Sequence, residues 1–262
     1  MINEELRERW FQDADGWRFD MPTGWMQGRS VFGGLTAAAA VALGMRHVDT
    51  SRRLRTLNVQ LLRPVVAGVV RGTCVKTREG KNISFLEVRL TQNESLVAIV
   101  NLIVVVPRAS KVRVELPMES IDASPDDLKE LPYVPGLTPE FTQHVSMRWA
   151  TGSPPFQNDP SRSFTGFCRF RGEAGGVEGV IGLLDVWPSP TLSMLSKPAF
   201  ASTVMWTAHI ASVPTFDDWF RFTYETAMGE DGYHTAVGKL HDAKGNVVGW
   251  TEQLVVVFDN ES

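Results

Sequence analysis

VFGGLTAAAAVALGMRHV, residues 31–48, predicts a helix that is apolar on all sides. Gly33 and Gly34 mark a tight entry to this helix, and an alanine-rich body follows them. A helix without a polar face has to be buried, so other elements must surround it. The small apolar run within it, residues 33–45, is too short to span a bilayer.

Four runs of strand length follow the helix, separated by turn residues such as Glu79-Gly80 and Gln92-Asn93. In NISFLEVRL, residues 82–90, the even-numbered and odd-numbered side chains form two different faces, as in a half-buried antiparallel strand. The first half therefore predicts a helix and then a meander of strands. The runs cover residues 54–64, 68–80, 82–92 and 95–106.

The second half repeats this order, which is the feature that organises the whole chain. GVEGVIGLLDVW, residues 176–187, is the second helix candidate, and strand-like runs follow at 201–212, 217–227, 234–242 and 246–258. When the ends of the two halves are aligned, Asn101 falls opposite Gln253, and each amide precedes four aliphatic residues.

A long antiparallel sheet wrapped around one central helix, occurring twice in one chain, is the double hotdog architecture of the α+β class. A Greek-key sandwich fits less well because it has no place for two buried helices. We expect a first hotdog unit at residues 1–107 and a second at 140–262. The segment between them, 108–139, is rich in Pro, Asp and Glu and is expected to be a surface linker.

Composition narrows the class of protein. The chain has 262 residues, of which 43% are hydrophobic, and a formal net charge of −4 with interspersed signs, so nucleic acid is a poor partner. Cys74 and Cys168 lie in strand-like runs and are expected to be two buried thiols in a reducing compartment. The N-terminus lacks the pattern of a secretory signal. We expect a cytoplasmic protein with no membrane partner.

Several kinds of chemistry have no signal in this sequence. There is no G-x-S-x-G motif, and the five histidines show no metal-ligand spacing. REGKNIS, residues 78–84, lacks the first glycine of a phosphate loop, and no Rossmann fingerprint opens a helix after a strand. Neither a metal nor a cofactor is therefore expected.

Three polar residues stand where apolar residues are expected. Asp185 lies in an otherwise apolar helix candidate, Thr203 lies early in the strand that follows, and Gln253 precedes the last aliphatic run. A buried carboxylate or amide is costly unless it is hydrogen-bonded or functional. Each has an ordinary alternative, because the helix could turn Asp185 to solvent, threonine is common in strands, and Gln253 could lie at an exposed edge.

The order of these three residues, with the strands around them, resembles the bacterial acyl-CoA thioesterase II (TesB-like) family, whose fold is a double hotdog. Residues 201–258 align with the family pattern without gaps, and RSVFGGL (29–35), QLLRP (60–64) and REGKNISF (78–85) are similar to its first half. The family usually has Gln after its paired glycines, whereas this chain has Leu35. That difference, and the apolar VMWTAH after Thr203, leave the substrate open.

The resemblance implies that Asp, Thr and Gln of the second unit bind and activate a hydrolytic water, here Asp185 as base with Thr203 and Gln253 holding the water. The substrate would be an acyl-CoA. We expect backbone N–H groups at Gly33 and Gly34 to meet the oxyanion, although a flexible helix entry also explains both glycines. Arg63, Arg78 and Lys81 are candidates for the phosphates of coenzyme A, with solvated surface charge as the alternative.

A different class of function stays open on the same fold. A double hotdog protein that binds acyl-CoA or another small ligand without catalysis would give saturable binding and no thiol release. A hydratase would need a histidine with its own local signature, and none is found around His209 or His234. Hotdog sheets usually pair, so a homo-oligomer is expected. Four tryptophans could either form its interface or belong to the core: Trp149, Trp206, Trp219 and Trp250.

Overall fold

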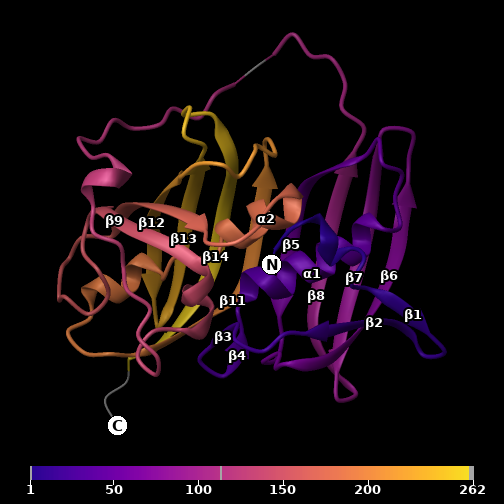
Figure 1. Cartoon of the computed structure of the whole chain (residues 1–262), viewed down its shortest axis with the longest axis horizontal. Coiled ribbons are helices and arrows are strands. Elements are labelled where there is room, and N and C mark those ends of the chain that lie inside the picture. Colours follow the sequence, from indigo (N-terminus) through magenta and orange to yellow (C-terminus); the bar gives the residue numbers. More distant parts are fainter. Residues whose placement is uncertain (1, 113, 260–262) are drawn as a thin grey trace.

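The computed structural model describes residues 2–112 and 114–259, and it confirms the double hotdog fold. Two curved antiparallel sheets lie next to each other, with the two helices near the middle of the molecule (Figure 1). No helix among the described residues is long and apolar enough to cross a membrane.

The two sheets join edge to edge into one sheet of 12 strands. The junction is an antiparallel pair between β5 and β11, running from Thr56 opposite His209 to Gln60 opposite Met205. Asn58 Nδ2 donates a hydrogen bond to Thr207 Oγ1 across it at 2.9 Å. In order across the sheet, the first half supplies β1 (Phe11–Asp13), β2 (Gly16–Met21), β6 (Gly68–Glu79), β7 (Ile83–Gln92), β8 (Ser95–Val105) and β5 (Arg53–Leu61).

The second half mirrors the first half outward from the junction. Its strands are β11 (Phe200–Ile210), β14 (Val247–Phe258), β13 (Tyr233–His241), β12 (Phe220–Glu230), β10 (Ser163–Phe170) and β9 (Val145–Thr151). The eight predicted strand runs are confirmed as β5 to β8 and β11 to β14. The sequence reading missed the outer strands of each half, β1 and β2 on one side and β9 and β10 on the other.

Helix α1 (Gly33–Met45) fills the concave side of the first half, and its residues from Gly34 to Gly44 are all buried. The expected alternation on β7 is also confirmed, because Ser84, Leu86, Val88 and Leu90 are buried beneath α1. Two further strands, β3 (Met26–Gln27) and β4 (Ser30–Val31), form a small hairpin just before the helix.

Helix α2 (Gly176–Leu183) is shorter than predicted and packs against α1. At their contact a Cβ on Gly34 would lie 3.2 Å from Gly182 Cα, so glycine lets the two backbones approach closely. Beyond α2, the 3-10 helix η4 (Pro190–Met194) covers part of the second sheet, and Leu192 packs with Val255 and Val257.

The remaining elements are short 3-10 helices: η1 (Glu4–Leu6), η2 (Pro125–Asp127) and η3 (Glu140–His144). The chain between β8 and β9 runs as a long connection from one half to the other (Figure 1). Cys168 is buried and Cys74 half-buried, and both thiols are free, so full burial was wrong for Cys74. Trp206 and Trp219 belong to the core, so an interface role was wrong for these two.

Candidate active site

Asp185 lies in the turn immediately after α2, not inside the helix as predicted. The helix ends at Leu183, and the Asp185 backbone N–H donates to the Gly182 carbonyl at 3.2 Å. The Leu184 side chain packs over Gly249. A Cβ atom added to Gly249 would lie only 3.2 Å from Leu184 Cδ1. The turn thus holds the carboxylate over the concave face of β14, where it keeps some contact with solvent.

Gln253 connects this carboxylate to the sheet. Its side chain is 3% exposed on the inner face of β14, and Nε2 donates to Asp185 Oδ1 at 2.9 Å. The amide oxygen accepts a hydrogen bond of 2.8 Å from Thr203 Oγ1. An amide can occupy this apolar position because it uses a donor on one side and its acceptor on the other.

A β-bulge gives Thr203 its inward orientation. Thr203 pairs with Val255, but the register shifts before Met205, which pairs with Leu254. Val204 is the extra residue of β11, so Thr203 and Trp206 both face inward although they are three residues apart. Trp206 lies opposite Gln253 and donates from Nε1 to Thr251 Oγ1, which fixes the floor of the site.

The first half contributes the N-terminus of α1. The backbone N–H of Gly34 hydrogen-bonds to Asp185, and a Cβ on Gly33 would lie only 2.8 Å from Asp185 Oδ2. Among the described residues, none accepts a hydrogen bond from the Gly33 N–H. The site therefore belongs to both halves, and its closest backbone contact requires a residue without a side chain.

The environment shifts the titration of Asp185 toward neutral pH. Burial disfavours the charged carboxylate and raises its pKa to about 7, while hydrogen bonds from Gln253 and Gly34 act in the opposite direction. A carboxylate with a pKa near neutrality can take up a proton during a reaction and release it again.

Tyr224 is a neighbour of this site that the sequence interpretation missed. Its ring is buried on the inner face of β12, where burial raises the pKa of the phenol and the negative charge of Asp185 raises it further. The alternation of Phe220, Phe222 and Tyr224 is a sequence signal for an inward-facing position.

The structure does not bring all the predicted basic residues to the site. Arg63 is exposed and lies two residues beyond Leu61. The Leu61 side chain lies next to Gly33, so Arg63 is near the start of α1. The Arg63 guanidinium donates a hydrogen bond of 2.8 Å to the Leu96 carbonyl. Arg78 and Lys81 lie at the other end of the strands, because their hairpin is level with Arg53. From Leu61 to Arg53 is eight residues, or roughly 25 Å along a strand.

One sequence expectation is corrected here. Asn101 is not the structural counterpart of Gln253, because it is exposed on the outer face of β8, opposite Asn58 and Glu87. Leu35 is 1% exposed inside α1 and packs in the core. The amide that completes the site is thus found in the second half alone.

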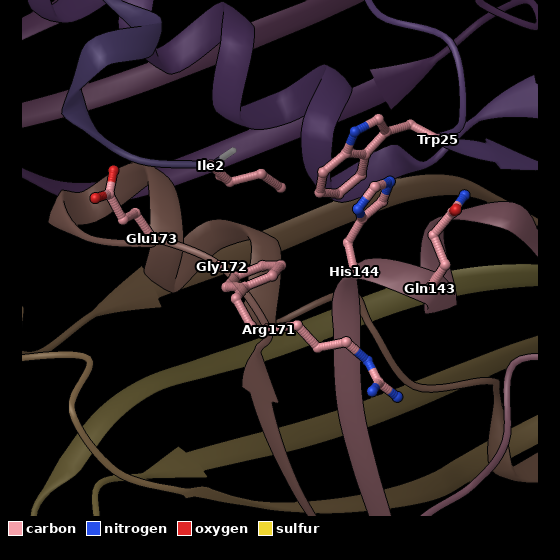
Figure 2. A pocket seen from close by; sticks show the side chains of 8 residues that line it. Ile2, Trp25, Gln143, His144, Arg171, Gly172 and Glu173 are labelled. Carbon is pink, nitrogen blue, oxygen red and sulfur yellow. The ribbon is translucent and has the colours of Figure 1, made fainter.

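A separate cavity of about 190 Å³ lies between the halves, away from Asp185. Figure 2 shows Trp25 and His144 facing each other at its edge, with Ile2 and Arg171 on other sides. The Trp25 and His144 rings stack with centroids 4.2 Å apart, and burial lowers the pKa of His144. Neither this cavity nor a more open one beside Tyr133 includes Thr203 or Gln253. Within the described residues, no three His, Cys, Asp or Glu side chains are grouped as metal ligands would be.

Known structures share this fold at low sequence identity. A conserved protein of unknown function with hot dog fold from Alicyclobacillus acidocaldarius has a TM-score of 0.88 and 17% identity, covering 98% of both chains. The acyl-CoA thioesterase II TesB2 of Mycobacterium marinum has a TM-score of 0.78 and 14% identity, covering 97% of this chain and 98% of that one. The tesB protein of Mycobacterium avium subspecies paratuberculosis has a TM-score of 0.77 and 15% sequence identity, and the match covers 92% of each chain.

Family models give the more specific comparison. None of the curated proteins compared with this chain matches it. The model of the acyl-CoA thioesterase N-terminal domain matches residues 21–106, and that of the acyl-CoA thioesterase C-terminal domain matches residues 125–257. With both domains present in order, and the second match alone spanning half of the sequence, the chain belongs to the acyl-CoA thioesterase family.

Proposed function

We propose that this protein hydrolyses the thioester of an acyl-CoA to a free acid and coenzyme A, by direct attack of an activated water. The observation that carries the proposal is the unbroken hydrogen-bonded chain from Thr203 through Gln253 to Asp185. Membership of the acyl-CoA thioesterase family supports acyl-CoA as the substrate.

In this mechanism Asp185 is the general base. It takes one proton from the water as the water oxygen bonds to the thioester carbon, and the carbonyl π electrons move to the carbonyl oxygen. When the tetrahedral intermediate collapses, the C–S bond breaks and the proton on Asp185 passes to the departing sulfur. The pKa of about 7 suits both transfers, and no covalent acyl-enzyme is needed.

Thr203 and Gln253 orient the water before attack. Gln253 has a second amide hydrogen beyond the one it gives to Asp185, and the threonine oxygen can accept as well as donate. Because Gln253 also fixes the carboxylate, the base and the nucleophile share one anchor on β14. Such positioning lowers the entropy cost of bringing water to the carbonyl carbon.

The N-terminus of α1 is suited to stabilise the developing oxyanion. Gly34 donates to Asp185 in the free protein, whereas the Gly33 N–H has no partner among the described residues. The positive end of the helix dipole favours negative charge at this point. We therefore assign the oxyanion contact to Gly33 and assign Gly34 to holding the base.

Arg63 is the basic candidate retained for the phosphates of coenzyme A. It is exposed at the end of β5 where Leu61 approaches Gly33. Arg78 and Lys81 are not assigned to this substrate contact, because their hairpin is at the far end of the strands.

The decisive experiment is a thiol-release assay across short, medium and long acyl-CoAs, with the purified chain and a thiol-reactive dye. Release that saturates with substrate supports the proposal, and the best chain length identifies the acyl group preferred. Saturable acyl-CoA binding without any thiol release would favour a binding protein on the same fold and would overturn the hydrolase.

A further inference from the structure

Tyr224 is almost completely buried, yet its hydroxyl has no partner. The residue is 2% exposed, and its ring packs edge-on against Phe222 and Phe164 at centroid distances of 5.2 and 5.9 Å. No described residue forms a hydrogen bond with the phenol oxygen. Buried tyrosine hydroxyls usually form a hydrogen bond, so the absence of a partner for this one needs an explanation.

Part of the small exposure that remains is at the hydroxyl itself. Side-chain atoms that are fully enclosed and unpartnered, within the part of the chain described, include Trp187 Nε1 and Ser84 Oγ but not the Tyr224 oxygen. The phenol therefore presents its polar end to accessible space while its ring is held in the core. A rigid donor with no competing partner is suited to meet a group that arrives from outside.

The strand register places Tyr224 on the same inner face of the sheet as the catalytic turn, on β12, two strands away from β14. Leu184 packs over Gly249 and Asp185 bonds Gln253, so the turn covers the inner positions of β14 between them. Tyr224 pairs with Gly238, which pairs with Thr251, midway along that stretch. The effect of the Asp185 charge on the pKa of Tyr224 agrees with this proximity and keeps the phenol protonated.

Three donor hydrogens of the site are already in use in the free protein, whereas the Gly33 N–H and the second Gln253 amide hydrogen have no partner among the described residues. Gly34 N–H and Gln253 Nε2 donate to Asp185, and Thr203 Oγ1 donates to Gln253. We propose that Tyr224 is a further catalytic residue, whose hydroxyl donates a hydrogen bond to the thioester carbonyl oxygen as negative charge develops there. This assignment rests on the proposed hydrolase function and adds a side-chain donor to the Gly33 N–H.

The test removes one oxygen atom. Tyr224→Phe keeps the ring that packs on Phe222 and Phe164, so the melting temperature should stay within a few degrees of the parent. We expect kcat for acyl-CoA hydrolysis to fall roughly 10- to 100-fold with KM raised less than about tenfold, because the contact strengthens in the transition state. Tyr233→Phe, at a 54% exposed tyrosine, is the matched control and should keep the parental kcat.

A binding comparison then locates the contact. One acyl-CoA analogue keeps the carbonyl and replaces the sulfur with CH₂, and the other is an alkyl thioether without a carbonyl. Tyr224→Phe should weaken binding of the first by roughly 3- to 10-fold, the range for one hydrogen bond, and leave the second unchanged. Equal weakening of both analogues would overturn the assignment, because it would mean that Tyr224 only shapes the pocket.

The outcomes separate this inference from the function on which it rests. If the parent releases thiol and Tyr224→Phe does so at the parental kcat, the assignment of Tyr224 is wrong and the hydrolase stands. If the parent releases no thiol from any acyl-CoA, both fail together. A lower kcat at an unchanged melting temperature, with selective loss of the carbonyl-bearing analogue, supports it.

Discussion

Gln253 Nε2 donates a 2.9 Å hydrogen bond to Asp185 Oδ1, although the two residues are 68 positions apart in the chain. The bond joins the central strand β14 to the turn after α2, and Gly34 of α1 reaches the same carboxylate. Three elements therefore fix the orientation of one half-buried acid. This arrangement limits the motion of the carboxylate and also makes its ionisation costly.

Replacing Asp185 with Asn should abolish most activity without loss of the fold. Asn has nearly the same shape but cannot accept the water proton, so we expect kcat to fall about 10²- to 10⁴-fold, as for loss of a general base. Thiol release and circular dichroism measure the two effects. Parental kcat in this variant would remove Asp185 from the mechanism.

The same variant should be more stable than the parent at alkaline pH. The folded-state pKa of Asp185 is raised from 3.8 to about 7, so the folded protein holds this proton after the unfolded chain has lost it. Its contribution to the free energy of unfolding therefore falls as pH rises from about 4 to 7. We expect the melting temperature of Asp185→Asn to exceed the parental value more at pH 8 than at pH 4. A lower melting temperature at pH 8 would contradict this energetic account.

Activity should follow the ionisation of one acid near neutral pH. Because the base must be deprotonated, kcat/KM should rise about tenfold per pH unit below a pH of about 7 and level off above it. The measurement is a rate profile from pH 5 to 9 at constant ionic strength. An inflection near pH 4, or a flat profile, would show that Asp185 titrates normally or does not limit the rate.

The sequence predicted the repeated units and the eight central strands because their apolar patterns are long and are separated by clear turns. It misplaced Asn101 because a strand alternates every residue, and alignment of strand ends does not show which face points inward. The sequence did not predict the bulge at Val204, because no glycine marks it. It also did not predict the contact between Gly34 and Asp185, because that contact depends on packing between helices from different halves. Tyr224 could be recognised as inward-facing, but its placement on the same face as the Asp185 turn depends on tertiary register.

Gly33→Ala should reduce activity by displacing the base. The added methyl would lie 2.8 Å from Asp185 Oδ2, so either the carboxylate or the start of α1 has to move. We expect kcat to fall at least about tenfold, since small displacements of catalytic groups are costly. Gly175→Ala, at the corresponding entry to α2, is the control, because its Cβ would meet nothing within 4 Å. Equal activity of both variants would contradict the close contact.

Thr203 and Gln253 should differ in what they tolerate. Thr203→Ser keeps the hydroxyl and should retain most activity, whereas Thr203→Val keeps the shape and should lose roughly tenfold in kcat because it cannot hold water. Gln253→Ala removes contacts to both neighbours and should cost on the order of 10- to 100-fold. Steady-state thiol release on the three variants checks the order. Thr203→Val as active as Thr203→Ser would exclude a role for the hydroxyl.

Arg7→Met should destabilise the fold while leaving kcat unchanged. Arg7 donates to Glu178 Oε1 at 2.7 Å and to Oε2 at 3.3 Å, and the Glu178 side chain is fully buried in the first turn of α2. Burial raises the pKa of Glu178 despite this pairing. Loss of Arg7 would therefore leave a buried carboxylate without its partner, which lowers the free energy of unfolding.

The expected cost is about 3 to 5 kcal/mol in the free energy of unfolding, the range for breaking a buried ion pair from one side. Urea denaturation measures it, and adding Glu178→Gln should recover part of the loss because the uncompensated charge is gone. Arg18→Met, at a solvent-exposed pair with Asp20, should change little. Because the pair lies at the start of α2 and Asp185 follows its end, folded Arg7→Met should keep the parental kcat. Stability equal to that of Arg18→Met would mean that Glu178 is protonated or hydrated in solution and that the pair does not anchor α2.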